Sequence, residues 1–113
     1  MADCLFCKII RGEIPSKKVY EDDGALAFYD INPQAPVHVL VIPKQHIASA
    51  AEITPENSAA VAHCFEVIAK VAQELHLEDG FRVISNVGEQ AGQTVHHLHF
   101  HILAGKSMGE RLV

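Results

Sequence analysis

Three histidines alternate with apolar residues near the end of the chain, in the run His97-Leu98-His99-Phe100-His101. In a β-strand, side chains alternate between two faces, so a strand here would gather the three imidazoles on one face. Burying such rings without partners would cost roughly a few kcal/mol each. The run therefore predicts that they meet water, a metal ion or a substrate. A neutral imidazole is also a good nucleophile toward phosphorus near neutral pH.

Two further features lie within reach of such a site. His38 interrupts the apolar run Val37–Ile42 and needs a polar partner. Alone it is best interpreted as a structural histidine. Beside the triad we predict a relay, because one ring nitrogen can donate while the other accepts. The loop 88–94 contains two glycines, which let backbone amides approach an anion, and its Gln93 and Thr94 add side-chain donors. We expect a phosphate cradle there, although most glycine-rich loops are only loops.

Cys4 and Cys7 form a Cys-x-x-Cys pair, and His46 follows a predicted strand. In isolation the two cysteines fit either buried thiols or a redox motif. A redox role is disfavoured because no thioredoxin-like βαβ pattern surrounds them. With Cys64 the chain has 3 cysteines, and this odd count argues against a disulfide framework.

The elements that would position these residues follow from periodicity and breakers. A short helix is predicted over 4–10, capped by Asp3 and followed by Gly12. Thr54-Pro55 starts an amphipathic helix of about five to six turns, which Asp79-Gly80 closes. Strands are predicted over 18–21, 25–30, 37–42, 81–86 and 95–103, with a hairpin turn at 21–24. This order predicts a single α+β domain over 1–113, with a mostly antiparallel five-stranded sheet and the long helix on one face.

Composition excludes several classes of function. The net charge is −5 and no Lys/Arg cluster is visible, so we expect no binding to a nucleic-acid polymer. A small nucleotide can still be held by amides, hydroxyls and a few histidines. No apolar run approaches the roughly 20 residues that span a bilayer, so no membrane partner is expected. The first residues resemble no signal peptide, which favours a cytoplasmic location.

The histidine run, extended by Ile102-Leu103, resembles the signature of the histidine-triad (HIT) family, in which three histidines alternate with apolar residues. The similarity also includes residues 28–38, 41–44 and 92–95, and it covers essentially the whole chain. The segment 103–108 is more similar to the Hint-type branch, the purine nucleoside phosphoramidases, than to the dinucleoside-polyphosphate-hydrolase branch. The resemblance implies a HIT-like fold.

The resemblance also implies a nucleotide hydrolase or transferase that cleaves purine nucleoside monophosphate conjugates, such as phosphoramidates, through a nucleotidyl-histidine intermediate. His99 would be the nucleophile, and His101 and His38 would orient it. Gln93 and Thr94 would hold phosphate oxygens and assist the leaving group. The remaining nucleotide contacts implied are a purine slot, a ribose contact and phosphate contacts: Phe6, Ile9, Phe28 and Ile31; Asp30; and Asn86 and Gly92.

Some family members bind a structural zinc, and the matching residues here are Cys4, Cys7, His46 and His97, an S₂N₂ set of the kind zinc prefers. No catalytic metal is required. A homodimer with a continuous sheet is implied. Three alternatives stay open: a dinucleoside polyphosphate hydrolase, a metalloenzyme whose triad binds a catalytic metal, and a non-catalytic nucleotide-binding protein. The short tail 109–113 leaves the leaving-group preference open. We assign no role to His96, and expect His63, His76 and Cys64 in solvated or core positions.

Overall fold

Five strands form one antiparallel sheet in the computed structural model, which describes residues 4–113. The order across the sheet is β1-β2-β3-β5-β4, and every neighbouring pair is antiparallel. The strands are β1 (Lys18–Glu21), β2 (Ala25–Tyr29), β3 (Val37–Pro43), β4 (Arg82–Ile84) and β5 (Phe100–Ala104). The helices are α1 (Leu5–Ile10), α2 (Ser58–Glu74) and two short 3-10 turns, η1 (Ala50–Glu52) and η2 (Glu89–Ala91). The predicted fold class is confirmed.

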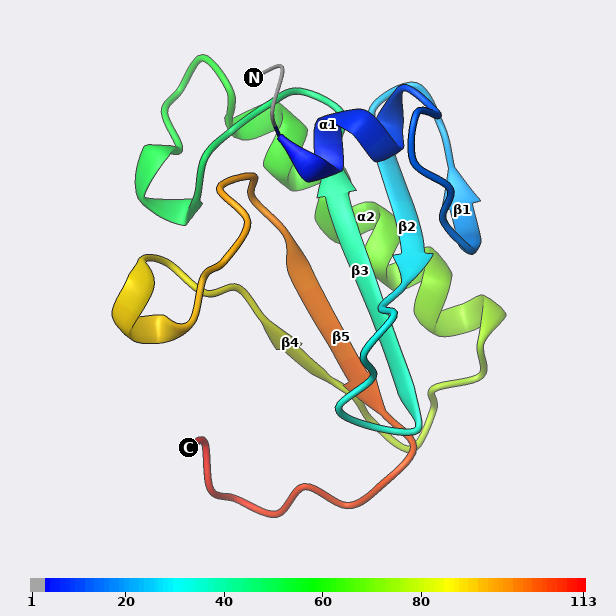
Figure 1. Cartoon of the computed structure of the whole chain (residues 1–113). Coiled ribbons are helices and arrows are strands. Elements are labelled where there is room, and N and C mark those ends of the chain that lie inside the picture. Colours follow the sequence, from blue (N-terminus) through cyan, green and yellow to red (C-terminus); the bar gives the residue numbers. More distant parts are fainter. Residues whose placement is uncertain (1–3) are drawn as a thin grey trace.

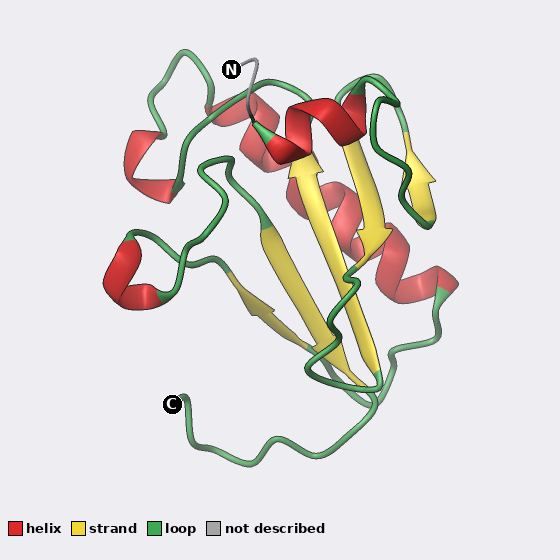
Figure 2. Ribbon diagram, in the orientation of Figure 1, coloured by secondary structure: helices red, strands yellow, loops and turns green. Residues whose placement is uncertain are grey.

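The sheet divides the core into two layers (Figure 1). Helix α2 runs across one face, where Val39, Val41 and Ile102 are fully buried. Helix α1 lies over one end of the opposite face, against Leu40 and Ile42. Because α1 has only 6 residues, it covers only part of that face. Figure 2 shows η1 and η2 in loops beside the sheet, where no helix was predicted. No described helix has the length and apolar character needed to cross a membrane.

The final strand is shorter than predicted. Regular pairing with β3 begins at Phe100, not at residue 95. Before that point the backbone bonds elsewhere: the Leu98 N–H donates to the Ile47 carbonyl (2.6 Å), and the Ser85 hydroxyl donates to the His99 carbonyl (2.8 Å). The alternation of faces nevertheless continues, because Leu98 packs in the α2 layer with Phe100. The histidines therefore keep their predicted side although two of them precede the strand.

Helix α2 begins three residues later than predicted, at Ser58 instead of Pro55, because Asn57 makes a different turn first. Its side-chain oxygen accepts from the Thr54 N–H (2.8 Å), and its amide donates to the Glu52 carbonyl (3.1 Å). The helix ends before Asp79-Gly80. His76 adopts a left-handed φ of 56°, and the Leu77 N–H donates back to the Ala72 carbonyl (2.9 Å), which closes the helix.

Helix α1 is capped by Cys4, whose sulfur accepts from the Cys7 N–H at 3.4 Å. The predicted cap, Asp3, lies outside the described residues. The predicted stop is where it was expected: Gly12 has a φ of 80°, and the Glu13 N–H donates to the Lys8 carbonyl (2.9 Å).

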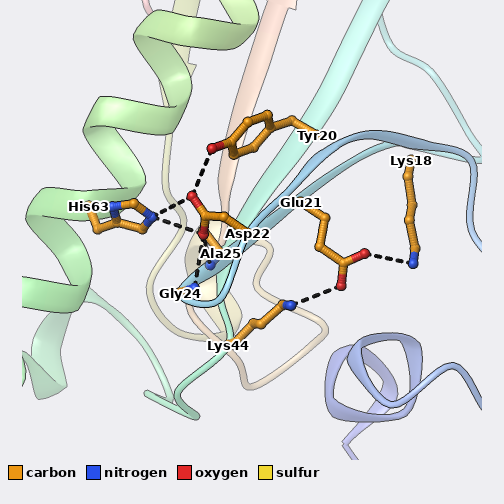
Figure 3. A network of polar contacts seen from close by, with 8 residues as sticks. All are labelled: Lys18, Tyr20, Glu21, Asp22, Gly24, Ala25, Lys44 and His63. Atoms are coloured by element: carbon orange, nitrogen blue, oxygen red, sulfur yellow. Dashed lines mark hydrogen bonds and ion pairs between the residues drawn. The ribbon is translucent and has the colours of Figure 1, made fainter.

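A polar network ties the β1–β2 turn to α2 (Figure 3). Both carboxylate oxygens of Asp22 lie 2.8–2.9 Å from Nε2 of His63, and Oδ1 also accepts from the N–H groups of Gly24 and Ala25. A side chain at Gly24 would meet the His63 ring, since a Cβ there would lie 2.9 Å from its Cδ2. His63, expected in a solvated or core position, is thus a structural contact of the turn.

This contact predicts a pH-dependent coupling. Burial alone would raise the pKa of Asp22, but hydrogen bonds from His63, the backbone and Tyr20 outweigh it and lower that pKa. The Asp22 contact raises the pKa of His63. The ion pair therefore contributes fully between roughly pH 4 and 6.5. It weakens as pH rises through the raised pKa of His63, or falls through the lowered pKa of Asp22.

A double-mutant cycle of Asp22→Asn and His63→Ala, followed by urea unfolding, should give a coupling of about 0.5–1 kcal/mol near pH 5.5, since both side chains are partly solvated. The coupling should be smaller at pH 9. Glu21→Gln is the matched control, because Glu21 precedes Asp22 and pairs with Lys18 and Lys44, not with a histidine. Equal coupling at both pH values would contradict the assignment.

Candidate active site

The three alternating histidines all lie on the α1 side of the sheet, but each contacts a different partner. His97 is fully buried, His99 is 7% exposed and His101 is half-buried. His99 and His101 line one cavity, and their ring centroids are 5.0 Å apart. His97 lies beside this cavity, behind Phe6, whose ring meets both His97 (5.9 Å) and His99 (5.1 Å) edge to face.

The hydrogen-bond partner of His99, a carbonyl two residues earlier in the chain, determines which ring nitrogen carries the proton. Nδ1 of His99 lies 2.7 Å from the main-chain carbonyl oxygen of His97. A carbonyl only accepts hydrogen bonds, so Nδ1 carries the proton. In a neutral imidazole the other nitrogen is then unprotonated, so Nε2 of His99 has a free lone pair.

A second chain of hydrogen bonds fixes His38 and His101. The Gln34 N–H donates to Nδ1 of His38 (3.0 Å), so His38 carries its proton on Nε2. That N–H faces Nδ1 of His101 at 2.9 Å. His101 therefore carries its own proton on Nε2, where it can be donated to a ligand. Oδ2 of Asp30 lies 3.5 Å from Nε2 of His38 and is the nearby negative charge.

Both rings of this pair are neutral at neutral pH. Burial, helped by the neighbouring His99 and His38 and opposed by Asp30, lowers the pKa of His101 to about 4. Burial also lowers the pKa of His38, and the nearby carboxylate of Asp30 opposes this shift. The two neutral rings thus form a chain of hydrogen bonds from a backbone N–H to the cavity, and neither ring carries a charge.

The cavity beside His99 measures about 280 Å³, near the lower end of the range for small-molecule sites. Eight of the predicted nucleotide and catalytic residues line it: Phe6, Ile9, Phe28, Asp30, Ile31, Thr94, His99 and His101. Ile31 is 92% exposed and stands at the edge. Leu40 also lines the cavity and was not predicted, although it pairs with His101 across the sheet and shares a face with His38. Ile14 also lines the cavity, and no sequence signal indicated it.

The predicted phosphate loop is only partly at the cavity. Thr94 lines it, but the Gln93 side chain is buried within the loop. Its amide donates to the carbonyls of Ala48 (2.8 Å) and Val95 (3.1 Å), and its oxygen accepts from the Gly88 N–H (2.9 Å). These bonds use the groups that were expected to hold phosphate.

Two other members of the predicted phosphate set lie outside the cavity lining. Gly92 ends η2 with a left-handed φ of 87° and shapes the loop. Asn86 is half-buried.

Four predicted metal ligands come together beside the cavity. One donor atom each from Cys4, Cys7, His46 and His97 lies within 4.8 Å of the others. Nδ1 of His97 is 3.4 Å from Sγ of Cys4 and 3.6 Å from Sγ of Cys7, and Nδ1 of His46 is 3.4 Å from Sγ of Cys7. In a tetrahedral zinc site, sulfur and nitrogen ligands are about 3.6 Å apart. The donors thus have the type and spacing that zinc prefers.

His97 is prepared for this role by its second nitrogen. Nε2 lies 2.8 Å from the Pro43 carbonyl and so carries the proton, which leaves Nδ1 with its lone pair toward the two sulfurs. Burial lowers the pKa of His97 to about 4, while the carbonyl contact opposes that shift. The ring is therefore neutral, as a metal ligand must be.

The geometry does not favour a metal shared by the three triad histidines. Their Nδ1 atoms face the cysteines, a carbonyl and His38 respectively. Asp30, His38 and His101 also have donor atoms within 4.8 Å of one another. However, His38 receives a backbone N–H on Nδ1 and must keep its proton on Nε2, the atom a metal would need.

The residues assigned no chemistry lie away from the cavity. His96 and His76 are exposed, and Cys64 is buried on α2.

Comparison with known proteins agrees with the fold and the histidine run. Residues 11–108 match the HIT domain family. The purine nucleoside phosphoramidase of Escherichia coli K12 is 45% identical over 111 residues, which are 97% of this chain and 93% of that protein. A HIT family hydrolase from Clostridium thermocellum superposes with a TM-score of 0.98 at 48% identity, covering 100% of this chain and 99% of that one. A histidine triad protein from Clostridium difficile gives 0.94 at 53% identity, with 98% and 97% covered. The chain therefore belongs to the histidine-triad (HIT) family.

Proposed function

We propose that this protein hydrolyses conjugates of purine nucleoside monophosphates, with phosphoramidates as the preferred class, through a nucleotide bound covalently to His99. The observation that carries the proposal is the hydrogen bond from Nδ1 of His99 to the His97 carbonyl, which leaves Nε2 unprotonated beside the cavity. The name of the Escherichia coli relative supports this substrate class.

In the first step, the lone pair on Nε2 of His99 forms a bond to the phosphorus, and the P–N bond to the leaving group breaks. The departing amine takes its proton from solvent water, while the Nε2–H of neutral His101 can donate a hydrogen bond to a phosphate oxygen. His99 becomes positively charged because both its nitrogens are now substituted. The His97 carbonyl stabilises that charge through the hydrogen bond it already accepts.

In the second step, water attacks the same phosphorus and the bond to Nε2 of His99 breaks. The attacking water releases a proton to solvent, which replaces the proton that the amine took, so every histidine regains its starting protonation. Covalent capture divides hydrolysis into two in-line displacements, in which positioning and charge stabilisation supply most of the acceleration. No metal takes part in either step.

The cavity residues support a nucleotide in one orientation. Phe6, Ile9 and Phe28 offer apolar surface to a purine, and the Asp30 carboxylate can accept hydrogen bonds from ribose hydroxyls. Thr94 remains the side-chain donor for phosphate. We assign Gln93 to the shape of the loop, because its amide is already bonded to backbone groups.

We also propose a structural zinc ion at Cys4, Cys7, His46 and His97. Two thiolates and two imidazoles would complete a closed tetrahedral site, which stabilises a fold and leaves no open position for catalysis. The distances among these donors support the assignment.

A homodimer is the third part of the proposal. Strand β4 is an edge of the sheet, and an edge presents unpaired backbone groups. Val83 on this strand is 36% exposed, and Phe65 on α2 is 51% exposed. Pairing of two β4 edges would cover both and continue the sheet.

His99→Ala should lose turnover of adenosine 5′-phosphoramidate by at least about a thousandfold while it still binds AMP, because the variant lacks only the nucleophile. His96→Ala, an exposed neighbour, is the matched control and should keep normal rates. Acid-free denaturation during turnover should also trap a nucleotide on His99, visible by mass spectrometry. Normal turnover by His99→Ala would contradict the nucleophile assignment.

The leaving-group preference is tested on a panel of adenosine phosphoramidates, adenylyl sulfate and dinucleoside polyphosphates. The highest kcat/KM on phosphoramidates is expected. Faster cleavage of dinucleoside polyphosphates would reassign the substrate class. Binding without turnover of any conjugate would instead indicate a nucleotide-binding protein.

Metal analysis of the purified protein should find about one zinc per chain, as a closed structural site requires. Cys7→Ser should lose most of this zinc and lower the melting temperature, because one of four ligands is gone. Cys64→Ala is the cysteine control, and its zinc content should match the wild type. Metal-free protein with unchanged thermal stability would argue against the site.

Sedimentation should show a dimer that Val83→Lys converts to monomer, since a charge on the edge strand opposes pairing. Ile53→Lys, at the same 36% exposure but outside the sheet, is the control and should stay dimeric. A monomeric wild type at micromolar concentration would rule out this interface.

A further inference from the structure

His97 belongs to two sites at once. Its imidazole meets the sulfurs of Cys4 and Cys7 through Nδ1, and its main-chain carbonyl accepts the proton of His99. The position of that carbonyl therefore depends on what holds the His97 side chain. Its polar contacts within the described residues are the two sulfurs and the Pro43 carbonyl, and the rings of Phe6 and His46 pack edge to face against it.

The same cluster joins three segments that are distant in the chain. Cys4 and Cys7 belong to the start of α1, His46 to the segment after β3, and His97 to the approach to β5. The segment of His46 also meets the triad through the backbone, because the Ile47 carbonyl accepts from the Leu98 N–H at 2.6 Å. Any ligand that binds all four donors fixes these segments relative to one another.

Phe6 transmits the position of α1 to the cavity. It lies between the two cysteines, is 5% exposed, and forms one wall of the cavity. Its ring contacts His97 and His99 edge to face and packs on Phe28 with centroids 5.7 Å apart. A shift of Cys4 and Cys7 would therefore move both the base-binding wall and a ring that touches the nucleophile.

We propose that the Cys4–Cys7–His46–His97 cluster is a positioning centre for the reaction: the metal ion it binds holds His99 in its reactive tautomer and Phe6 in its place against the base. The proposal rests on the proposed function and on the proposed metal site. It adds that metal occupancy controls catalysis and nucleotide affinity, beyond its effect on stability.

The physical reason is that the contacts without an ion are weak. Thiol–imidazole contacts of 3.4–3.6 Å restrain the His97 ring much less than metal–ligand bonds do. If the His97 carbonyl moves, the Nδ1 proton of His99 loses its acceptor and can transfer, through solvent, to Nε2. That tautomer has no lone pair toward the phosphorus. A misplacement of about 1 Å is enough to reduce a rate by about 100-fold.

The test compares zinc-loaded protein, protein stripped by a chelator under reducing conditions, and stripped protein with Zn²⁺ or Co²⁺ returned. Cobalt reports tetrahedral thiolate ligation by its absorption spectrum. Three properties are measured in each state: the ¹⁵N resonances of the His99 ring, which distinguish its tautomers; the affinity for AMP by calorimetry; and kcat and KM for adenosine 5′-phosphoramidate.

Stripping should convert the His99 resonances from those of the single Nδ1–H tautomer to those of a mixture. We expect kcat to fall about 10- to 100-fold and AMP to bind several-fold more weakly, with all three properties restored by zinc. Cys64→Ala, outside the cluster, should behave as the wild type. If the stripped chain does not fold, His46→Ala, which leaves three donors, provides the same comparison.

Stripped protein with an unchanged His99 tautomer and AMP affinity would overturn the proposal, as would protein that binds neither zinc nor cobalt. A loaded protein that cleaves no conjugate, yet changes tautomer and affinity with metal, would refute the proposed function and still support the positioning role. The two failures are therefore distinguishable.

Discussion

One hydrogen bond determines what the cavity can do: the bond from Nδ1 of His99 to the main-chain carbonyl of His97. A free imidazole exchanges its proton between two nitrogens, and only one tautomer directs a lone pair toward a given point. A carbonyl two residues earlier selects that tautomer without adding a charge. The main chain supplies this acceptor because residues 97–99 precede the regular ladder, which begins at Phe100. The carbonyl that orients the proposed nucleophile thus lies where the chain departs from an ideal strand.

The rest of the fold keeps this bond in a protected but accessible place. One face of the sheet is covered along its length by α2 and carries Leu98, Phe100 and Ile102. The opposite face is covered by α1 only at one end, and the cavity lies beside this helix, lined by Phe6 and Ile9 of α1 and by Phe28 and Leu40 of the sheet.

The sequence allowed the face of each histidine to be predicted, because alternation along an extended chain survives even where regular pairing does not. The ligand set of Cys4, Cys7, His46 and His97 was indicated only by resemblance, since their spacing says nothing about proximity in space. Two features were inaccessible. Thr54-Pro55 has the pattern of a helix start, but the Asn57 side chain bonds to the Thr54 N–H and the Glu52 carbonyl, and the helix begins only at Ser58. The side-chain amide of Gln93 is a donor close to the triad, but it is already bonded to the carbonyls of Ala48 and Val95. The positions of these two carbonyls depend on the conformation of the loop. When groups distant in the chain compete to bind one polar side chain, the residues next to it in the sequence do not show which group binds it.

The choice of partners for the imidazoles has an electrostatic logic. A carboxylate beside a histidine raises its pKa and favours the protonated ring, which has no lone pair to attack phosphorus or bind a metal. Here His97 and His99 donate to main-chain carbonyls, and His38 receives a backbone N–H. The carboxylate of Asp30 lies 3.5 Å from Nε2 of His38, beside its contact with His101, and burial still lowers the pKa of His101 to about 4. Orientation by neutral dipoles thus adds no charge that would oppose the lowered pKa values of His38, His97 and His101, which are uncharged at neutral pH. This need for uncharged groups explains how one residue, His97, can serve both sites. Its side chain must be neutral to bind a metal, and its main-chain carbonyl, which orients His99, carries no charge.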